Sequence, residues 1–470
     1  MGNITEINDI KAYLKEHENK QLLRFITCGS VDDGKSTLIG RLLHDSKVIF
    51  EDQLASIKKD SKKSNTTENE FDLSLLVDGL QSEREQGITI DVAYRYFSTP
   101  KRKFIIADTP GHEQYTRNMA TGASTANLAI ILIDARYGVQ TQTRRHTFIN
   151  KLLGIKEFVI AINKMDLVGF DQEIFNQIKD DYLNFAKELE VDANITIIPL
   201  SALNGDNIVN RSYKSPWYKG LTLMEHLESV NIENSDDFTQ FSFPVQYVNR
   251  PNLDFRGFCG TIASGDVQVG DKIKVLPSNK VSTIKTILTS QGAENSAFVN
   301  QAITLTLNDE IDISRGDLIV KEDSSIACAS GFDVDIVWLN EESLKLNRQY
   351  IIKRATTTTL GSFSKIVYKT DVNSLEKSSS EALNLNEIAK VKLELEQDIA
   401  FTKYNDNKTL GSFIVIDKIS NNTVGAGMIR DSFENKKEVE NKKRVYTAFE
   451  IELNALIRKH YPEWESKEIF

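Results

Sequence analysis

The sequence has few cysteines, no excess of basic charge and no long hydrophobic run, and each shortage excludes a class of protein. Only 3 of the 470 residues are cysteine, namely Cys28, Cys259 and Cys328, and their wide spacing gives no metal-ligand pattern. A zinc site and a disulfide framework are therefore both disfavoured. We expect three small buried side chains in a reducing compartment.

No stretch approaches the roughly 18 apolar residues that a membrane helix needs. Residues 1–21 are rich in charged side chains and lack the apolar core of a signal peptide. The sequence therefore predicts a cytoplasmic protein without a membrane partner. The formal net charge of −10 argues against bulk nucleic-acid binding, so no nucleic-acid partner is expected.

The length of 470 residues predicts two or three domains, because single domains usually span about 100–200 residues. The first part of the chain alternates apolar strand runs with longer helical patterns. Its continuous apolar runs, typical of strands covered on both faces, are residues 23–28, 104–107, 128–134, 158–163 and 195–201. Residues 92–97 alternate instead, which predicts an edge or antiparallel strand. This pattern indicates an α/β domain with a mostly parallel sheet and helices on both faces.

After about Asp236 the chain consists of short strand-like runs separated by turn signals such as Ser264-Gly265-Asp266, which predicts two small β-barrels. The expected organisation is a helical extension at 1–21, the α/β domain at 22–235, barrels at 236–324 and 325–446, and a helical tail at 447–470. The apolar positions of residues 445–460 share one helical face, which favours a packed terminal helix over a partner-docking one. The polar residues 58–70 are expected to form a mobile loop or exposed helix.

A glycine-rich stretch joins the first apolar strand to a helical pattern. It matches the phosphate-loop pattern G-x-x-x-x-G-K-[ST] and consists of Gly29, Ser30, Val31, Asp32, Asp33, Gly34, Lys35 and Ser36, with Thr37 opening the helix. Gly29 and Gly34 allow the backbone to curl so that successive N–H groups point at phosphate oxygens, and the helix adds its positive dipole end. We expect Lys35 to reach the β- and γ-phosphates and Ser36 to ligate Mg²⁺.

Guanine selectivity is predicted from the buried strand at residues 158–163, which leads into Asn163, Lys164, Met165 and Asp166. A carboxylate at Asp166 can accept from N1–H and the exocyclic amine of guanine, whereas adenine would leave it unpaired. Asn163 is expected to support the loop and the Lys164 stem to cover one face of the base. The guanine oxygen is expected to accept from backbone N–H groups of Ser201, Ala202 and Leu203. A simple strand-ending turn is the alternative, and the upstream phosphate loop disfavours it.

The strand at residues 104–107 leads into Asp108, Thr109, Pro110, Gly111 and His112. Asp108 is well placed to hold Mg²⁺ through a water, and Gly111 can offer its N–H to the γ-phosphate and flip when that phosphate leaves. His112 is the candidate for positioning the attacking water. A histidine near a turn would be an ordinary surface residue without this context. Catalysis of this kind is positioning and electrostatics, so His112, Lys35 and Gly111 are the expected catalytic residues.

Residues 84–89 end in a threonine that can act as a switch. Thr89 can complete the Mg²⁺ shell only while the γ-phosphate is present. Loss of this ligand on hydrolysis would release residues 46–88, which predicts an order–disorder transition.

Together these elements resemble the translation-factor class of GTPases, the group of elongation factor Tu. The residues that carry the resemblance are Val31-Asp32, 84–89, 108–113 and 163–166, and the two barrels fit the same class. Within it, residues 27–43, 113–124 and 199–209 are similar to the large GTPase subunits of bacterial sulfate adenylyltransferase, the CysN type. Asp33 supports this assignment, because translation carriers usually have histidine at that position.

The resemblance implies a function that the residue chemistry does not show. Such chains pair with a smaller catalytic subunit, the CysD type, as a hetero-oligomer that converts ATP and sulfate into adenylylsulfate and pyrophosphate for sulfate assimilation. GTP hydrolysis drives this uphill reaction, and the coupling can be no larger than the difference in partner affinity between the GTP and GDP states. No second phosphate loop is visible before Phe470, so an adenylylsulfate kinase is expected elsewhere.

Two alternatives remain at this point. The chain could carry aminoacyl-tRNA as a translation GTPase does, which would require a basic, aromatic-bearing surface on the barrels. Net charge and Asp33 lean against this without deciding it. It could also be a regulatory GTPase that binds a protein partner and governs no chemistry besides its own.

Overall fold

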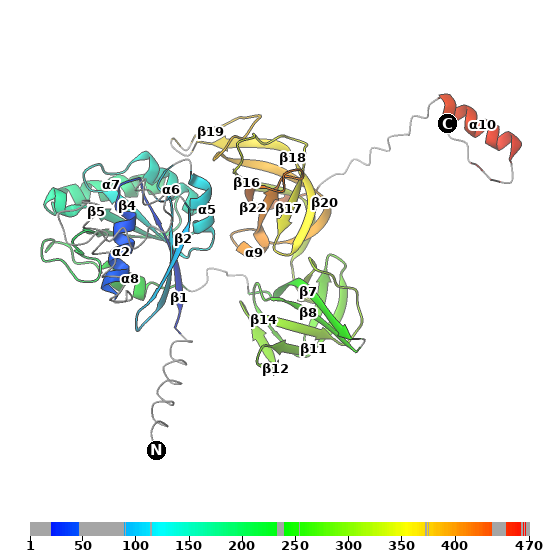
Figure 1. Cartoon of the computed structure of the whole chain (residues 1–470), viewed down its shortest axis with the longest axis horizontal. Helices are drawn as coiled ribbons and strands as arrows, with labels where there is room; N and C mark the ends of the chain where they lie inside the picture. The colour runs from blue at the N-terminus through cyan, green and yellow to red at the C-terminus, as the bar shows by residue number, and fades with distance from the viewer. Residues whose placement is uncertain are drawn as a thin grey trace, which may run out of the picture.

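The structure is a computed structural model that describes residues 20–46, 89, 91–112, 115–232, 239–252, 254–371, 374, 376–434, 448–461, 464 and 466. An α/β domain is followed by two β-barrels and a C-terminal helix, which confirms the predicted fold class (Figure 1). The predicted helix at 1–21, apart from its last two residues, lies outside the described residues. So do the polar segment at 58–70 and nearly all of residues 46–88.

The sheet of the α/β domain has the strand order β2-β3-β1-β4-β5-β6. All neighbours are parallel except β2, which pairs antiparallel with β3 at the edge and confirms the prediction for residues 92–97. The strands are β1 (Leu22–Cys28), β2 (Ala93–Ser98), β3 (Lys103–Asp108), β4 (Leu128–Asp134), β5 (Glu157–Asn163) and β6 (Asn194–Pro199). The helices are α2 (Lys35–Asp45), α5 (Thr116–Ser124), α6 (Thr141–Leu152), α7 (Gln172–Glu188), α8 (Leu223–Ser229) and the 3-10 turn η3 (Met165–Val168).

Two hydrophobic cores lie on opposite faces of this sheet. Side chains of α2 and α8 pack on one face, with Phe25 and Phe104 among the buried strand residues. Side chains of α5, α6 and α7 pack on the other, around Ile131 and Phe158. Every residue of β4 is buried. The continuous apolar runs therefore follow from burial on both faces.

Each barrel is a sheet closed by one additional pairing. In the first, the order β10-β15-β7-β8-β14-β11-β12 closes through β10–β11, and in the second, β17-β21-β22-β16-β20-β18-β19 closes through β17–β18. The first consists of β7 (Ser242–Asn252), β8 (Phe255–Thr261), β10 (Lys272–Leu276), β11 (Lys280–Thr289), β12 (Gly292–Glu294), β14 (Ala302–Leu307) and β15 (Leu318–Lys321), beside a ribbon of β9 (Asp266–Gln268) and β13 (Ser296–Phe298). The second consists of β16 (Ala327–Trp338), β17 (Gln349–Arg354), β18 (Thr357–Thr370), β19 (Lys377–Ser378), β20 (Ile388–Phe401), β21 (Ser412–Ile416) and β22 (Thr423–Phe433), with the short helix α9 (Lys408–Gly411).

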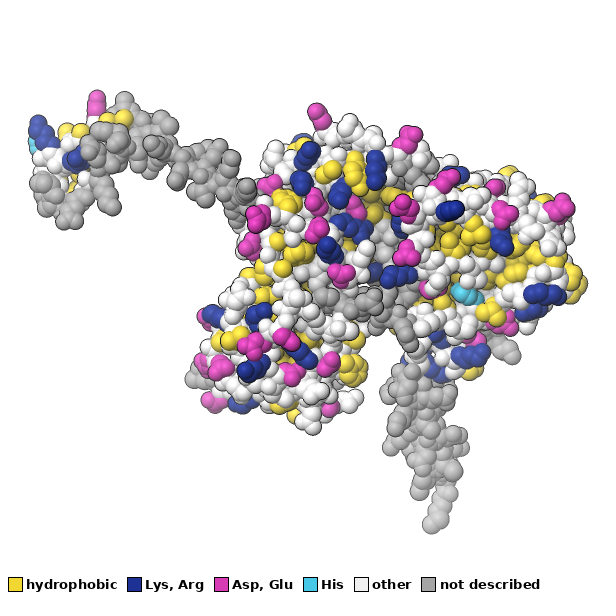
Figure 2. Space-filling view, turned by 180° about the vertical axis from the view of Figure 1, so that it is seen from behind, with side chains coloured by type: hydrophobic (Ala, Val, Ile, Leu, Met, Phe, Trp, Pro, Cys, Tyr) yellow, Lys and Arg dark blue, Asp and Glu magenta, His cyan; other side chains and the backbone are white. Residues whose placement is uncertain are grey.

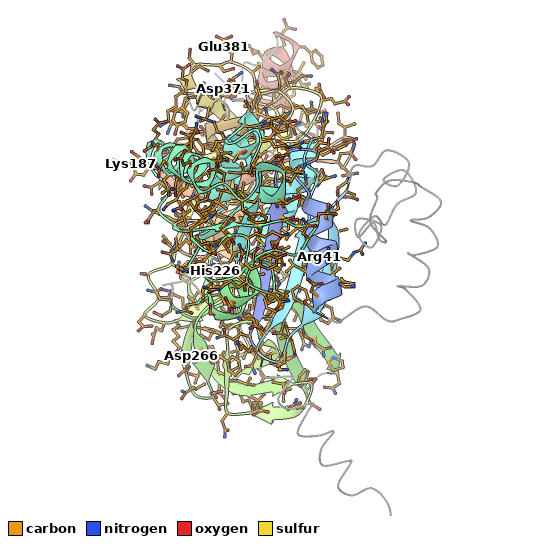
Figure 3. All side chains as sticks on the ribbon, turned by 90° about the vertical axis from the view of Figure 1, so that its left-hand side faces the viewer. Arg41, Lys187, His226, Asp266, Asp371 and Glu381 are labelled. Carbon is orange, nitrogen blue, oxygen red and sulfur yellow. The ribbon has the colours of Figure 1, made fainter. Side chains whose placement is uncertain are left out.

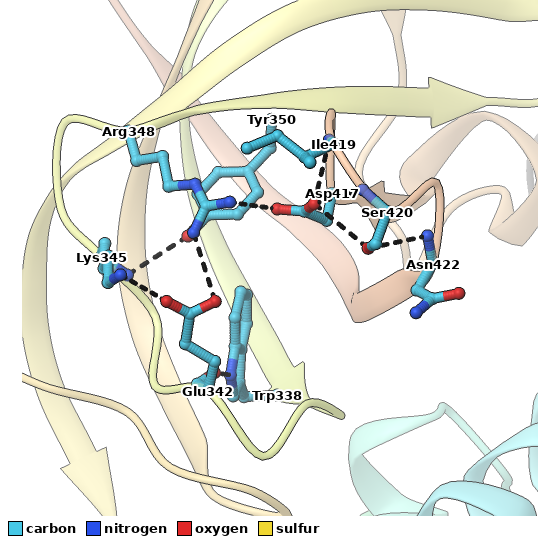
Figure 4. Close-up of polar contacts among 9 residues, drawn as sticks. All are labelled: Trp338, Glu342, Lys345, Arg348, Tyr350, Asp417, Ile419, Ser420 and Asn422. Atoms are coloured by element: carbon cyan, nitrogen blue, oxygen red, sulfur yellow. Dashed lines mark hydrogen bonds and ion pairs between the residues drawn. The ribbon is translucent and has the colours of Figure 1, made fainter.

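A polar cluster ties two turns of the second barrel together (Figure 4). The Arg348 guanidinium contacts the carboxylates of Glu342 and Asp417, which come from different turns. The Asp417 carboxylate also accepts from the backbone N–H groups of Ile419 (3.0 Å) and Ser420 (2.8 Å). These contacts fix one end of the barrel.

The second barrel packs against the α/β domain at the C-terminal end of α6. Tyr404 Oη donates to the carbonyl of Leu153 over 3.1 Å, and Arg430 Nη2 donates to the carbonyl of Leu152 over 3.1 Å. Val337 and Met428 extend the α/β core into the barrel. The last carbonyls of a helix have no partner within it, so these two side chains serve as its cap.

Two predictions about apolar side chains are corrected. Cys28 is buried as expected, but Cys259 and Cys328 are only half-buried. Helix α10 (Ala448–His460) was expected to pack, yet Phe449 is 70% and Leu456 54% exposed. Periodicity identifies the apolar face of a helix, but it does not show what covers that face. None of the described helices is both long and apolar enough to cross a membrane.

Candidate nucleotide-binding site

The predicted phosphate loop is a tight turn between β1 and α2. Three of its residues have positive φ angles, 152° at Gly29, 68° at Asp32 and 90° at Gly34. Aspartate is among the side chains that tolerate this conformation, and glycine adopts it without a steric penalty. Lys35 Nζ lies inside the turn and donates to the carbonyls of Gly29 (3.0 Å) and Ser30 (2.8 Å). The loop is thus folded around a buried ammonium group.

The electrostatics of this loop suit a polyanion. Lys35 is 7% and Asp33 8% exposed. Burial lowers the pKa of Lys35, and the charges of Asp108 and Asp33 oppose that effect. Burial likewise raises the pKa of Asp33, whose carboxylate accepts from the Ser30 N–H over 2.5 Å. Phosphate oxygens supply the negative charge that a buried ammonium group favours.

The segment after β3 reaches this loop, as predicted. A Cβ atom on Gly111 would lie 2.5 Å from Lys35 Nζ and 2.7 Å from the Gly29 carbonyl, so only glycine fits there. Thr109 Oγ1 anchors the segment by donating to the Thr27 carbonyl over 2.7 Å. Asp108 is 1% exposed at the end of β3 and lies beside Thr27 of β1 in the strand register.

Three further residues of this prediction are His112, Pro110 and Thr89. His112 is exposed, and its ring meets that of Tyr115 edge-on with centroids 6.1 Å apart. Pro110 is buried beside Gly111. Thr89 is half-buried, but the residues on both sides of it lie outside the described part of the chain. Its predicted place in the metal shell therefore stays a prediction.

The residues near Lys35 fit a magnesium ion bound together with phosphates. Ser36 follows Lys35 in the first turn of α2, and Asp108 is close enough for its charge to raise the pKa of that lysine. A hydroxyl and a carboxylate are oxygen ligands of the kind that Mg²⁺ prefers, while phosphates and waters usually complete its shell.

The predicted base-binding loops meet the phosphate loop through two side chains, Asn163 and Lys164. Asn163, at the end of β5, donates from Nδ2 to the Asp33 carbonyl over 2.7 Å and accepts at Oδ1 from the Ala202 N–H over 2.9 Å. Lys164 Nζ donates to the Asp32 carbonyl over 2.5 Å. Segments near residues 33, 163 and 202 therefore lie next to one another, and together they are the candidate pocket.

The other residues of the predicted base-binding loops differ in burial and in their contacts. The Met165 side chain is fully buried, and its N–H donates to the Leu200 carbonyl over 3.2 Å, so this residue packs rather than faces the pocket. Asp166 follows in η3 and is half-buried. Arg41 of α2 donates from Nε to the Ala202 carbonyl over 3.2 Å and from Nη2 to that of Leu203. Figure 3 labels Arg41 on this helix.

Comparison with known proteins places the chain in a family. Residues 20–234 match the family described as elongation factor Tu GTP binding domain, and residues 331–430 match the family described as GTP-eEF1A C-terminal domain-like. Sulfate adenylyltransferase subunit 1 of Aliarcobacter butzleri is 72% identical over 98% of both chains. The chain belongs to the sulfate adenylyltransferase subunit 1 family. The proteins of that name from Teredinibacter turnerae and Saccharophagus degradans are each 59% identical to this chain. The aligned regions cover 98% of this chain, 98% of the first protein and 97% of the second.

Both resemblances stated from the sequence are thereby confirmed, the elongation factor Tu class and the sulfate adenylyltransferase subunit family. Sequence reasoning nevertheless missed three residues of this family member's site, Asp134, Arg41 and His146. Asp134 could have been found, because it ends β4 opposite Asn163 and the carboxyl ends of parallel strands share one edge. Arg41 of α2 contacts the Ala202 and Leu203 carbonyls and His146 of α6 contacts the Gly29 N–H, and their sequence spacing gave no signal.

Asp134 holds the base-side lysine in place. Its carboxylate lies 3.0 Å from Lys164 Nζ and 2.7 Å from Arg136 Nη2. Burial raises the pKa of Asp134, but hydrogen bonds from Arg136 and Lys164 outweigh burial and lower the pKa to about 2. Asp134 therefore stays ionised and keeps Lys164 extended toward the pocket.

Proposed function

We propose that the chain binds and hydrolyses GTP with Mg²⁺ as the GTPase subunit of a heteromeric, cytoplasmic sulfate adenylyltransferase. The observation that carries the nucleotide part is the Asn163 side chain, which connects the phosphate loop to the Ser201–Leu203 loop. A pocket that joins a phosphate-binding turn to a half-buried carboxylate at Asp166 has the two recognition elements that GTP requires.

Each residue has a role that follows from its place in this pocket. Lys35 would contact the β- and γ-phosphates, and the Gly111 N–H would donate to the γ-phosphate. The exposed His112 side chain would orient the attacking water. At the other end, Asp166 would accept from the guanine ring. The metal, held through Ser36, Asp108 and Thr89, would neutralise charge that develops on the phosphates.

The adenylyl-transfer part of the proposal is supported by the relatives. Proteins 57–72% identical over nearly the whole chain carry the name sulfate adenylyltransferase subunit 1, which implies at least one further subunit. We propose that this is the smaller catalytic subunit, which forms adenylylsulfate and pyrophosphate from ATP and sulfate. GTP hydrolysis would drive that reaction by changing the affinity between the subunits, and the coupling is limited to that change.

The surface agrees better with this proposal than with an RNA carrier. On the face drawn in Figure 2, the described Lys and Arg side chains are interspersed with Asp and Glu side chains over both barrels. An RNA-binding surface would instead concentrate basic and aromatic side chains.

One experiment tests the whole proposal. The chain is purified with its native partners, and adenylylsulfate formation from ATP and sulfate is measured with GTP, with GDP and without guanine nucleotide. We expect adenylylsulfate formation to increase with GTP but not with GDP. The increase should be lost when the Lys35→Ala chain replaces the wild-type chain in the complex. GTPase activity without a partner, accompanied by tRNA binding, would overturn the assignment.

A further inference from the structure

A buried histidine contacts the phosphate loop from behind. His146 lies on α6 and is 3% exposed. Its Nδ1 accepts a hydrogen bond from the backbone N–H of Gly29, the first residue of the loop, over 3.1 Å. The two residues are 117 positions apart in the sequence, so the contact is produced by the fold. The Gly29 N–H, which the sequence pattern assigned to phosphate, is therefore directed at His146.

The contact defines the state of the imidazole ring. A nitrogen that accepts a hydrogen bond carries no proton, so neutral His146 holds its proton on Nε2. Burial, followed by the charges of Lys35 and Arg145, lowers the pKa of His146 to about 3. The ring is thus a neutral acceptor at any pH where the protein works, rather than a cation for phosphate or a proton donor.

The two peptide groups that flank Gly29 are each held by a side chain. His146 accepts from its N–H, and Lys35 Nζ donates to its carbonyl over 3.0 Å. A Cβ atom on Gly29 would lie 3.0 Å from Asp33 Oδ2 and 3.1 Å from the Leu132 carbonyl, so a larger residue would require these neighbours to shift. The orientation of the two peptide groups sets the direction in which the following amides point.

The helix that carries His146 is itself fixed. Asn150, one turn along α6, donates to Cys28 Sγ over 3.3 Å and so contacts the same strand end. Thr147 Oγ1 lies 3.1 Å from Tyr182 Oη of α7. At the far end of α6, Tyr404 and Arg430 of the second barrel cap its last carbonyls. A histidine on such a helix is a firm support for the loop.

We propose that His146 is a positioning residue that orients the phosphate loop by accepting the Gly29 N–H. This role rests on the proposed GTP binding and adds to it a residue outside the phosphate-loop sequence. Replacing the acceptor leaves a buried N–H unpaired, and the loop must either bear that cost or turn away from its binding shape. The expected loss of GTP affinity is about tenfold or more.

The test uses two amide substitutions that differ in where they place an acceptor. In His146→Asn, Oδ1 is bonded to Cγ as Nδ1 is in histidine, so it can accept from Gly29. In His146→Gln the amide begins one bond farther out, so its carbon takes the place of Nδ1 and its oxygen lies as far along the side chain as Nε2. His146→Leu removes all polar atoms. Thermal unfolding of each full-length variant is measured to establish that it is folded.

Two measurements are made on these chains. Amide hydrogen exchange of the peptide containing Gly29 is followed by mass spectrometry without nucleotide, and the Kd for Mg²⁺-GTP is measured by calorimetry. We expect wild type and His146→Asn to protect Gly29 and bind GTP similarly. His146→Gln and His146→Leu should exchange faster and bind at least about tenfold more weakly. The exchange measurement does not depend on GTP, so it tests the contact even if the wild-type chain failed to bind GTP.

Two outcomes would overturn the inference. Equal exchange and equal GTP affinity in all folded variants would show that the Gly29 contact does not orient the loop. A loss that is as large in His146→Asn as in His146→Leu would show that the ring's shape matters, rather than its acceptor.

Discussion

The two ends of the candidate pocket are held in different ways. At the phosphate end, Lys35, Asp33 and His146 are all less than 9% exposed, and their contacts run to backbone atoms. At the base end, the side chains of Arg41 and Lys164 are 19% and 23% exposed. Water and salt weaken charge interactions at exposed positions far more than at buried ones. The contacts of these residues at the phosphate end are therefore shielded from water, and those of Arg41 and Lys164 are partly open to it.

Asn163 connects these two ends, and it explains why they act as one pocket. Its amide donates toward Asp33 and its carbonyl accepts from Ala202, so both hydrogen-bonding atoms are used. A Cβ atom on Gly34 would lie 2.5 Å from Asn163 Nδ2, which shows how closely the two loops approach. Lys164, which donates to the Asp32 carbonyl, is a second direct connection between the two ends.

The largest loss of GTP affinity is expected from a substitution at the phosphate end. Lys35→Ala removes the buried ammonium group and leaves two loop carbonyls without their donor, so GTP binding should fall by about 100-fold or more. The Kd of each variant for Mg²⁺-GTP is measured by calorimetry. Lys187→Ala, at the end of α7 and exposed, is the matched control and should bind as wild type does. Retention of full affinity in Lys35→Ala would contradict the assignment of the phosphate end.

A second effect should separate binding from hydrolysis. His112 is exposed beside the phosphate end, so His112→Ala should leave the Kd for GTP unchanged and slow hydrolysis about 100-fold. Single-turnover hydrolysis with GTP prebound measures the chemical step alone. Unchanged turnover would remove His112 from the proposed mechanism.

At the base end, the expected change is one of selectivity. Asp166→Asn replaces a pure acceptor by a group that also donates, so GTP affinity should fall about tenfold while xanthosine triphosphate is gained as a ligand. Competition between the two nucleotides for the variant measures the ratio. A variant that still rejects xanthosine triphosphate and keeps full GTP affinity would show that Asp166 does not contact the base.

The smallest effect should come from the support behind the base loop. Arg41→Ala removes donors to the Ala202 and Leu203 carbonyls, and these are part-exposed contacts, so GTP affinity should weaken only about twofold to fivefold. Arg41→Lys tests geometry, because one ammonium group cannot match a forked guanidinium. A loss as large as that of Lys35→Ala would break the distinction between the two ends.

Secondary structure could be predicted from the sequence where burial produces a regular hydrophobic pattern. The α/β strands were identified because burial on both faces gives continuous apolar runs, as in β4. Strand β22 was missed, because Gly425 and Gly427 interrupt its apolar run. Gly427 is required there, since a Cβ atom would lie 2.1 Å from the ring of Phe413. Such an approach is a property of the packing between strands, which no local pattern contains.

The same limit applies to the candidate site. Its loops carry short sequence patterns, so Gly29–Ser36 and Asn163–Asp166 could be identified, and they are brought together by Asn163 and Lys164. His146 and Arg41 carry no pattern of their own, and their partners lie 117 and 161 positions away. The polar side chains that support a binding loop are therefore visible only in three dimensions.

The most direct measurement is the affinity of the purified chain for GTP and for ATP, each with Mg²⁺, under the same conditions. A pocket with a phosphate loop at one end and the Asp166 carboxylate at the other should prefer GTP by about 100-fold or more. Equal affinity for GTP and ATP would contradict the proposal that this pocket selects guanine.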